Sequence, residues 1–573
     1  MRGLSLIQAV FLIVQFGCAH QVRIVAPTVD RPKVAHEASS RDVMVTSQGG
    51  ATTRAALSIL SQGGNIIDAF VAASLTISVE RPHSTGLGGG GFLLYFEKQN
   101  NQVYAFDFRE VAPLRARSNM YLDKKGETQT LLSQDGALAV ATPGLVRGLF
   151  HIHQRFGKLP WKDCTGPAVK VARDGFPLYP QLQEALIDRK DVLWDDPEMR
   201  RTFFTKGGSV PLLGTIIYQE NLAKTLEKIG RQGDSAFYEG EVASAIIKTI
   251  RDHRGIMTHK DLREYRMVER KPVTGNYKGL KLFSMPPPSS GGIHVIQILK
   301  MLEPYNLKEM KPQSVEAVHL TANAMQRAFL DRAMYLGDPD FNKIPTDDLV
   351  NENYIQAMSS QINSSAAIKA GDLRPVKLPY ESDDTTHFTI ADREGNMVAS
   401  TQTINGWFGS GVMAQGTGII LNNEMDDFAQ KVGAQNLFGA VGGKYNLVEP
   451  KKRPLSSMSP TIITKNGAPL MALGSPSGTR IISCVAQTIL NAVEFEMPLY
   501  EAVSATRIHQ QWQPDVLKVE APFLNSDVEK ELEKKGHKIS HESLGCSIQA
   551  IKREGKTWIG VSDPRGEGLA QGI

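Results

Sequence analysis

Cysteine is scarce in this chain of 573 residues, which contains four. One lies in the apolar leader described below, and the other three are Cys164, Cys484 and Cys546. An odd and sparse set does not build a disulfide framework, and the separation of these cysteines from clustered histidines argues against a zinc site. We therefore expect all three to be small buried side chains.

An excess of one charge is also missing. The chain has 64 basic and 60 acidic side chains, for a net charge of +4, and the basic residues are spread along its length. This balance argues against a nucleic-acid or membrane-surface partner. Hydrophobic residues make up 41% and charged residues 22%, which is ordinary for a globular protein with a large core. The length allows about four domains of ~150 residues or one large α/β unit.

Long apolar runs are confined to the N-terminus. Residues 1–19 contain a basic residue, an apolar run over 4–16 and three small residues, which is the layout of a secretory signal. Cleavage after Ala19 would release an exported protein, periplasmic or secreted, and this is the fate we favour. The alternative is lipidation of Cys18, whose preceding residues match a lipoprotein signal poorly. No later run approaches the ~20 residues that span a bilayer, so the mature chain should not cross a membrane.

Helical and strand patterns alternate along the rest of the chain. Apolar residues at three- and four-residue spacing predict helices over 52–60, 66–78 and 314–336. Short β-branched or aromatic runs predict strands over 92–97 and 103–108. Helices mixed with strands over the whole length favour a layered α/β sandwich.

A polar segment with two prolines, residues 366–384, predicts an exposed connection. Two strands of a β-hairpin, 385–391 and 397–404, follow it at once, joined by a polar turn. If the two strands pair across that turn, the residue numbers of each cross-strand pair add up to 788 or 789.

This register sets the neighbours of Thr385. Thr403 or Ile404 lies opposite it, and Thr403 and Asn405 share its pleat parity. The hairpin alone therefore brings two hydroxyls and an amide together at its open end.

The hairpin also begins the first of several strings that together resemble the γ-glutamyltranspeptidase family. Further matches lie upstream, at 86–91 and in Asp107-Phe108-Arg109-Glu110. The downstream strings are Asp384-Thr385-Thr386-His387-Phe388, Asn422-Asn423-Glu424-Met425-Asp426-Asp427-Phe428, and Arg453-Pro454-Leu455-Ser456-Ser457-Met458-Ser459-Pro460-Thr461. They occur in the family order and spacing and cover nearly all the chain after the leader.

The resemblance implies an N-terminal-nucleophile hydrolase with a four-layer αββα sandwich. Thr385 would attack the carbonyl of Asp384, dividing the precursor into a large subunit (20–384) and a small subunit (385–573) that form a heterodimer. The freed α-amine of Thr385 would then act as base for its own hydroxyl. An α-amine has an ordinary pKa of ~7.7 to 8.0, so part of it is neutral near physiological pH.

The resemblance also assigns a pocket for a zwitterionic γ-glutamyl group. Arg109 would bind its α-carboxylate, because a guanidinium can donate two parallel hydrogen bonds, and Ser456 and Ser457 would complete that site. The group that holds the α-ammonium would be Asn405, Glu424 and Asp427. Thr403 would hydrogen-bond the hydroxyl of Thr385.

Two further features carry a role by resemblance. The oxyanion donors would be the backbone N–H groups of Ser477 and Gly478, where the family has two glycines; Ser477 tolerates positive φ less well than glycine. Phe438 would be the aromatic gate of a lid loop. The glycines of 86–91 lack the Lys and Ser/Thr of a P-loop, so we expect close backbone packing near the active site instead.

The implied reaction is ping-pong transfer of the γ-glutamyl group from glutathione or a related amide to water, an amino acid or a peptide. It implies small-molecule partners and no metal or organic cofactor. Two alternatives remain: an acylase of the same fold acting on cephalosporin-type or polyglutamate amides, and a binding protein that stays a single chain.

Overall fold

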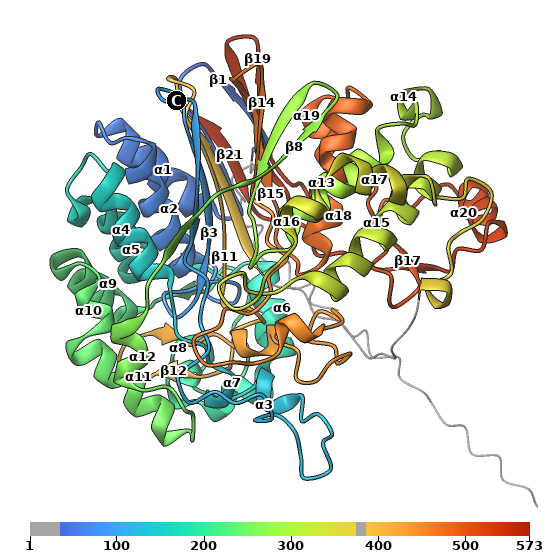
Figure 1. The fold of residues 1–573 in the computed structure, drawn as a ribbon. Helices are drawn as coiled ribbons and strands as arrows, with labels where there is room; N and C mark the ends of the chain where they lie inside the picture. The colour runs from blue at the N-terminus through green and yellow to red at the C-terminus, as the bar shows by residue number, and fades with distance from the viewer. Residues whose placement is uncertain (1–34, 374–384) are drawn as a thin grey trace, which may run out of the picture. The chain divides into compact units, whose positions relative to one another are not determined.

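The computed structural model describes residues 35–373 and 385–573. Two seven-stranded antiparallel sheets form its centre (Figure 1). One sheet has the order β21-β2-β10-β11-β3-β4-β7 and the other β1-β20-β19-β15-β14-β9-β8. The strands of the first sheet are β21 (Leu569–Gly572), β2 (Met44–Ser47), β10 (Thr386–Ala391), β11 (Met397–Thr403), β3 (Gly90–Glu97), β4 (Gln102–Asp107) and β7 (Val268–Arg270). Those of the second are β1 (Glu37–Ser40), β20 (Thr557–Ser562), β19 (Gln549–Glu554), β15 (Ala468–Gly474), β14 (Thr461–Lys465), β9 (Leu280–Ser284) and β8 (Val273–Tyr277).

Helices cover the outer face of each sheet, which gives the αββα order of layers within residues 35–573 (Figure 1). The helices on the side of the first sheet include α1 (Gly50–Ser61), α2 (Ile66–Glu80), α4 (Leu145–Phe156), α5 (Trp161–Asp174), α9 (Glu220–Gln232) and α11 (Gly240–Asp252). Those on the side of the second include α13 (Gly291–Leu302), α15 (Val315–Tyr335), α17 (Glu352–Ser359), α18 (Arg480–Ile489) and α19 (Leu499–Ser504). The predicted layered sandwich is confirmed, and each predicted helix and strand named above has a counterpart within a few residues.

Strand alternation divides the core in two. Phe388 and Ile390 of β10 pack in the cluster that contains α1 and α2, whereas Met397 and Ala399 of β11 pack in the cluster between the sheets and under α13. Because both faces of β10 and β11 are covered, every residue of these strands is buried. The central hairpin is therefore held rigidly from both sides.

The predicted hairpin register is also confirmed. Thr386 pairs with Gln402 and Ala391 with Met397, an index sum of 788, which continues to Thr385 opposite Thr403. β10 is flanked by β2 on its other side. The hairpin thus sits in the middle of its sheet, and the start of β10 is fixed at the sheet's end.

All three cysteines are buried, as expected, but the expectation that they form no disulfide was wrong. Cys484 and Cys546 form a disulfide, although 62 residues separate them. α18 places Cys484 beside the segment that leads into β19, a proximity that spacing along the chain does not reveal. Cys164 lies 3.6 Å from the ring of a single histidine, His153, and 3.8 Å from the Asp68 carboxylate.

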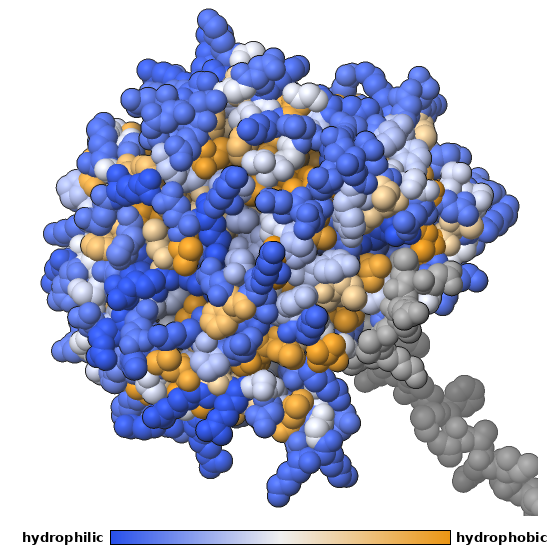
Figure 2. Space-filling model, viewed as in Figure 1, coloured by the Kyte–Doolittle hydropathy of each residue, from blue (hydrophilic) through white to orange (hydrophobic). Residues whose placement is uncertain are grey.

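On the face shown in Figure 2, hydrophobic residues are interspersed with hydrophilic ones. In the described ranges, no helix has both the length and the apolar character needed to cross a bilayer. The predicted signal at 1–19, Asp384 and most of the predicted connection 366–384 lie outside the described residues.

Candidate active site

A small cavity of about 20 Å³ lies at the start of β10. Its wall contains ten of the residues discussed here: Thr385, Thr403, Asn405, Arg109, Glu424, Asp427, Ser456, Ser457, Phe438 and Gly478. Thr385 is 5% exposed. Residues predicted from motifs more than 300 positions apart thus meet in one place, with Thr385 among them.

The end of the hairpin places the side-chain amide of Asn405 in the same cavity wall as Thr385, the candidate nucleophile. The hydroxyl of Thr403 accepts a hydrogen bond from the backbone N–H of Asn405 at 2.8 Å. Asn405 adopts a left-handed backbone with φ of 72°, and its side chain donates to the carbonyl of Asn423 at 3.0 Å. This turn joins the strand end to the segment that leads into Glu424.

The glycines of 86–91 pack backbone against backbone, as predicted. A Cβ on Gly89 would come within 2.0 Å of the carbonyl oxygen of Thr403, and one on Gly88 within 2.1 Å of that of Ile420. Side chains here would push β3 away from β11. The glycines therefore allow the approach that places Thr403 in the cavity.

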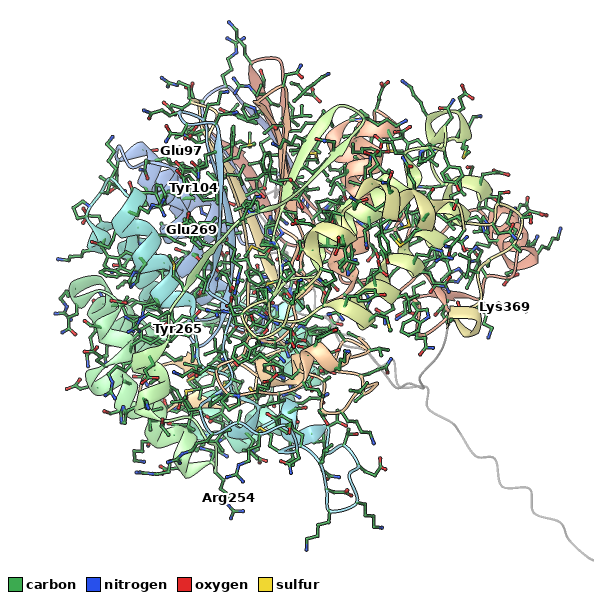
Figure 3. All side chains as sticks on the ribbon, in the orientation of Figure 1. Glu97, Tyr104, Arg254, Tyr265, Glu269 and Lys369 are labelled. Carbon is green, nitrogen blue, oxygen red and sulfur yellow. A yellow bond between two sulfur atoms is a disulfide. The ribbon has the colours of Figure 1, made fainter. Side chains whose placement is uncertain are left out.

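A cluster of buried charges forms the far wall. Arg109 is 1% exposed and pairs with both Glu424 and Asp427. Its Nε donates to the carbonyl of Pro454 at 3.3 Å, and Tyr265, labelled in Figure 3, donates to the carbonyl of Arg109 at 2.8 Å. The predicted carboxylate-binding and ammonium-binding residues are therefore in direct contact with each other.

Burial and charge shift the titration of this cluster. Burial would lower the pKa of Arg109, but the charges of Glu424 and Asp427 raise it above its ordinary value. Burial raises the pKa of Glu424 to about 7, against the opposing charge of Arg109. Glu110, fully buried, has its pKa raised well above the ordinary value by burial and by the charge of Glu424. A proton on Glu110 would make these two carboxyl groups a hydrogen-bonded pair.

The serine pair is hydrogen-bonded to a proline-rich loop, residues 285–292. The backbone N–H of Ser456 donates to the carbonyl of Pro288, and that of Ser290 donates back to the carbonyl of Ser456, both at 2.8 Å. This loop follows β9 directly. It holds Ser456 and Ser457 against the cavity.

Ser477 has a positive φ, a backbone conformation that glycine adopts more easily than serine. Its φ is 102° and that of Gly478 is 49°. The Ser477 hydroxyl donates to the carbonyl of Leu544. A Cβ on Gly478 would lie 2.4 Å from the ring of Phe438, so the predicted gate residue packs directly on the second predicted oxyanion donor.

The loop that carries Phe438 is tied to the acidic turn. The side chain of Asn436 donates to Asp427 at 2.6 Å and accepts from the N–H groups of Phe438 and Ala440 at 3.0 Å. The N–H of Leu437 donates to Asp426 at 2.6 Å. Asp427, which pairs with Arg109, and its neighbour Asp426 thus also hold the loop over the cavity.

Two residues at the site were not identified from the sequence. Glu110, which lies beside Arg109 in the charge cluster, belongs to a quoted motif but received no role. Arg332, on α15, lines the cavity and is 6% exposed. The only sequence signal that could have identified Arg332 was the charged pair Asp331-Arg332 within a predicted helix.

One potential metal-ligand group lies elsewhere. In the part of the chain that the structure describes, ligand atoms of Asp68, His153 and Cys164 come within 4.8 Å of one another. The Asp68 carboxylate already accepts hydrogen bonds from the N–H groups of Asn65, Lys158 and Leu159. Burial raises the pKa of the Cys164 thiol, which disfavours the thiolate that a metal needs. The group is explained as an anchor at the start of α2.

Comparisons with known proteins give a consistent result. Residues 52–573 match the model of the family described as gamma-glutamyltranspeptidase. The glutathione hydrolase proenzyme of Escherichia coli (strain K12) is 42% identical, with 93% of this chain and 92% of that protein covered. That of Pseudomonas aeruginosa is 39% identical, with 93% and 96% covered.

Solved structures agree. The cephalosporin acylase of Bacillus halodurans superposes with a TM-score of 0.83 at 25% identity, over 96% of this chain and 99% of that one. A chain of Helicobacter pylori gamma-glutamyltranspeptidase gives a TM-score of 0.56 at 36% identity, over 57% of this chain and 93% of its own.

Proposed function

This chain belongs to the γ-glutamyltranspeptidase family, and we propose that it is a glutathione hydrolase that activates itself by cleavage before Thr385. The observation that carries the proposal is the meeting of Thr385, paired charges of both signs and Gly478 around one cavity, with Ser477 next to Gly478 in the chain. A zwitterionic acyl group needs both charges, and its tetrahedral intermediate needs donors near the reacting carbonyl.

In maturation, the Thr385 hydroxyl attacks the carbonyl of Asp384 and the peptide bond becomes an ester. Water cleaves that ester, leaving a carboxylate on Asp384 and a free α-amine on Thr385. The products are the large subunit 20–384 and the small subunit 385–573. Relatives named as proenzymes support this step.

In turnover, the α-amine accepts the hydroxyl proton of Thr385 as its oxygen attacks the γ-carbonyl. The backbone N–H groups of Ser477 and Gly478 donate to the oxyanion. The C–N bond then breaks, the proton passes to the leaving amine, and the γ-glutamyl group stays on Thr385 as an ester. Water or the amine of an amino acid or peptide attacks this ester and restores the hydroxyl.

Binding follows from the charges around the cavity. The α-carboxylate is bound by Arg109, Ser456 and Ser457, and the α-ammonium by Glu424, Asp427 and Asn405. Because Arg109 pairs with the acidic side chains in the structure, substrate binding requires these partners to be shared or exchanged. Phe438 closes the cavity and limits water and bulky donors.

Export is part of the proposal. A disulfide between Cys484 and Cys546 fits an oxidising compartment outside the cytosol. The leader 1–19 would direct the chain there, and the mass of the mature N-terminus would show whether cleavage follows Ala19 or a lipid is attached to Cys18.

Replacing Thr385 with alanine tests the central claim. We expect Thr385→Ala to remain one chain on a denaturing gel and to lose all γ-glutamyl hydrolysis. Thr386→Ser, which keeps a hydroxyl at the next position, should split into two chains and stay active. A Thr385→Ala protein that still divides at this site would refute self-cleavage by this residue. A wild type that never divides would favour a single-chain binding protein instead.

The acylase alternative draws on the fold similarity to the cephalosporin acylase. The acylase and the glutathione hydrolase are distinguished by comparing hydrolysis of a γ-glutamyl anilide with that of a glutaryl anilide, which lacks the ammonium. The acidic pair at the cavity favours the γ-glutamyl substrate, and a preference for the glutaryl compound would favour the acylase.

A further inference from the structure

The loop that we propose to carry the oxyanion donors, residues 475–479 (the oxyanion loop), is anchored through the hydroxyl of Ser477. The loop runs from the end of β15 at Gly474 to the start of α18 at Arg480. The Ser477 hydroxyl donates to the carbonyl of Leu544, in a distant part of the chain. Because Ser477 has a φ of 102°, which any side chain disfavours, this bond helps to keep the residue in that conformation. The direction of the Ser477 N–H therefore depends on the position of Leu544.

Leu544 lies in a segment without regular secondary structure. Residues 542–548, all within the described range, form no helix or strand and lead into β19. The N–H of Leu544 donates to the carboxylate of Glu520 at 3.0 Å, and the carbonyl of Cys546 accepts from Arg507 at 3.2 Å. Side chains of other elements therefore hold the middle of this segment.

The disulfide joins this segment to the helix that follows the oxyanion loop. Cys546 comes shortly after Leu544 in the chain, and Cys484 lies in α18, about one helical turn after Arg480. The Sγ of Cys546 is also 3.7 Å from the carbonyl of Arg480. The N–H of Arg480 in turn donates to the carbonyl of Ser477 at 3.0 Å. Donor and acceptor of the bond between Ser477 and Leu544 are thus both tied to one covalent link.

We propose that the disulfide between Cys484 and Cys546 is a positioning element for turnover, which holds the carbonyl of Leu544 where it keeps Ser477 at positive φ. This inference rests on the proposed function. Without the link, the segment around Leu544 separates from α18, and Ser477 relaxes toward the negative φ that a serine prefers. Its N–H then turns away from the oxyanion. Formation and hydrolysis of the γ-glutamyl ester both pass through an oxyanion, so both steps become slower.

The test measures kcat and KM separately with γ-glutamyl-p-nitroanilide as the donor. In Cys484→Ala combined with Cys546→Ala we expect kcat per processed small subunit to fall about 10-fold, less than the ~100-fold or more that deletion of an oxyanion donor costs, because the donor is displaced and not removed. KM should stay within about twofold of the wild type, since this donor acts only in the transition state.

The decisive comparison repeats the two cysteine replacements in Ser477→Gly. Glycine adopts positive φ without an anchor, so loss of the disulfide in this background should change kcat by less than about twofold. A merely structural role for the disulfide predicts the same loss of kcat with serine and with glycine at this position. That result, or an unchanged kcat with serine, would overturn the inference.

Leu532→Ala is the control for lost stability. Its side chain is buried on α20 (Ser526–Lys534) and lies outside the cavity wall. Its truncation should lower the free energy of unfolding and leave kcat near that of the wild type. A similar fall in kcat in this control would mean that kcat follows stability, and the inference would be wrong.

If the double alanine variant does not divide into two chains, maturation becomes the readout, and adding Ser477→Gly should restore the division. Failure to restore it would overturn the inference. A wild type without γ-glutamyl hydrolysis would overturn the proposed function and the inference with it. An active wild type whose kcat survives loss of the disulfide would overturn the inference alone.

Discussion

Ser477 shows how one side chain can strain the loop that we propose to carry the oxyanion donors. Its φ of 102° lies where a Cβ clashes with the neighbouring backbone, and glycine would avoid this cost. The hydroxyl offsets part of the strain by donating to the carbonyl of Leu544. The loop therefore keeps its N–H groups in place with a residue that the backbone conformation disfavours.

Replacing Ser477 separates these two effects. Ser477→Ala loses the hydrogen bond and keeps the strain, whereas Ser477→Gly loses the bond and removes the strain. We expect the glycine variant to be more stable than the alanine variant by about 1–2 kcal/mol, the reverse of their order in a helix. Urea unfolding of the two variants measures the difference. Equal stabilities, or a more stable alanine variant, would show that φ here carries no cost.

Glu424 should make donor selection depend on pH. Its pKa is raised to about 7 by burial, so it loses its negative charge as the pH falls through that value. A neutral carboxyl holds an ammonium less well, and the preference for a γ-glutamyl anilide over a glutaryl anilide should fall about tenfold per pH unit below pH 7. Using this ratio cancels the titration of the Thr385 amine, which both substrates share. In Glu424→Gln the ratio should be low and independent of pH; a pH-dependent ratio in that variant would assign the effect to another group.

At the scale of elements, the loop that carries Phe438 over the cavity is held by the acidic turn 424–427, which also pairs with Arg109. Asn436 connects Asp427 with the backbone of the segment around Phe438. Ligand binding at Asp427 and closure of the loop are therefore linked through one amide side chain. This link explains how Phe438 can be held against the cavity although it lies on a loop and not on a strand.

Removing this link should loosen the loop. Asn436→Ala deletes the bond to Asp427 and the two bonds accepted from the loop backbone. We expect faster limited proteolysis within residues 431–443 and a loss in kcat/KM of about 10-fold, because each buried bond to a charged group contributes about 1.5–3 kcal/mol. Val432→Ala, at a position 63% exposed on the same loop, is the matched control. Proteolysis equal in both variants would mean that other contacts hold the loop.

For the whole molecule, the two proposed subunits share both sheets. The sheet that contains β10 takes β2, β3, β4 and β7 from residues before 374 and β10, β11 and β21 from residues after 384. Cleavage before Thr385 would leave all these pairings in place. The subunits should therefore stay together through strand pairing and a common core, without a covalent link.

The disulfide tests this arrangement, because both its cysteines lie in the proposed small subunit. Reduction should not change the two bands on a denaturing gel, since no disulfide joins the subunits in the described residues. Cys484→Ala combined with Cys546→Ala should lower the free energy of unfolding by about 2–4 kcal/mol, as measured by urea titration. A single band without reductant that becomes two with it would contradict the intrachain pairing.

The sequence by itself determined the elements whose periodicity is local. The helix at 66–78, the register that sets Thr385 opposite Thr403, and the close packing of 86–91 followed from spacing, turn residues and glycine content. The motifs also identified most of the residues that line the cavity with Thr385, because their order along the chain matched a known family.

Tertiary structure alone decided which distant groups touch. The pairing of Arg109 with Glu424 and Asp427, the disulfide between Cys484 and Cys546, and the place of Arg332 in the cavity wall depend on how the layers stack. Local periodicity sets which face a side chain occupies, but not which side chain from another layer meets it. A charge placed between layers takes its partners from the packing, so its role appears only in the folded chain.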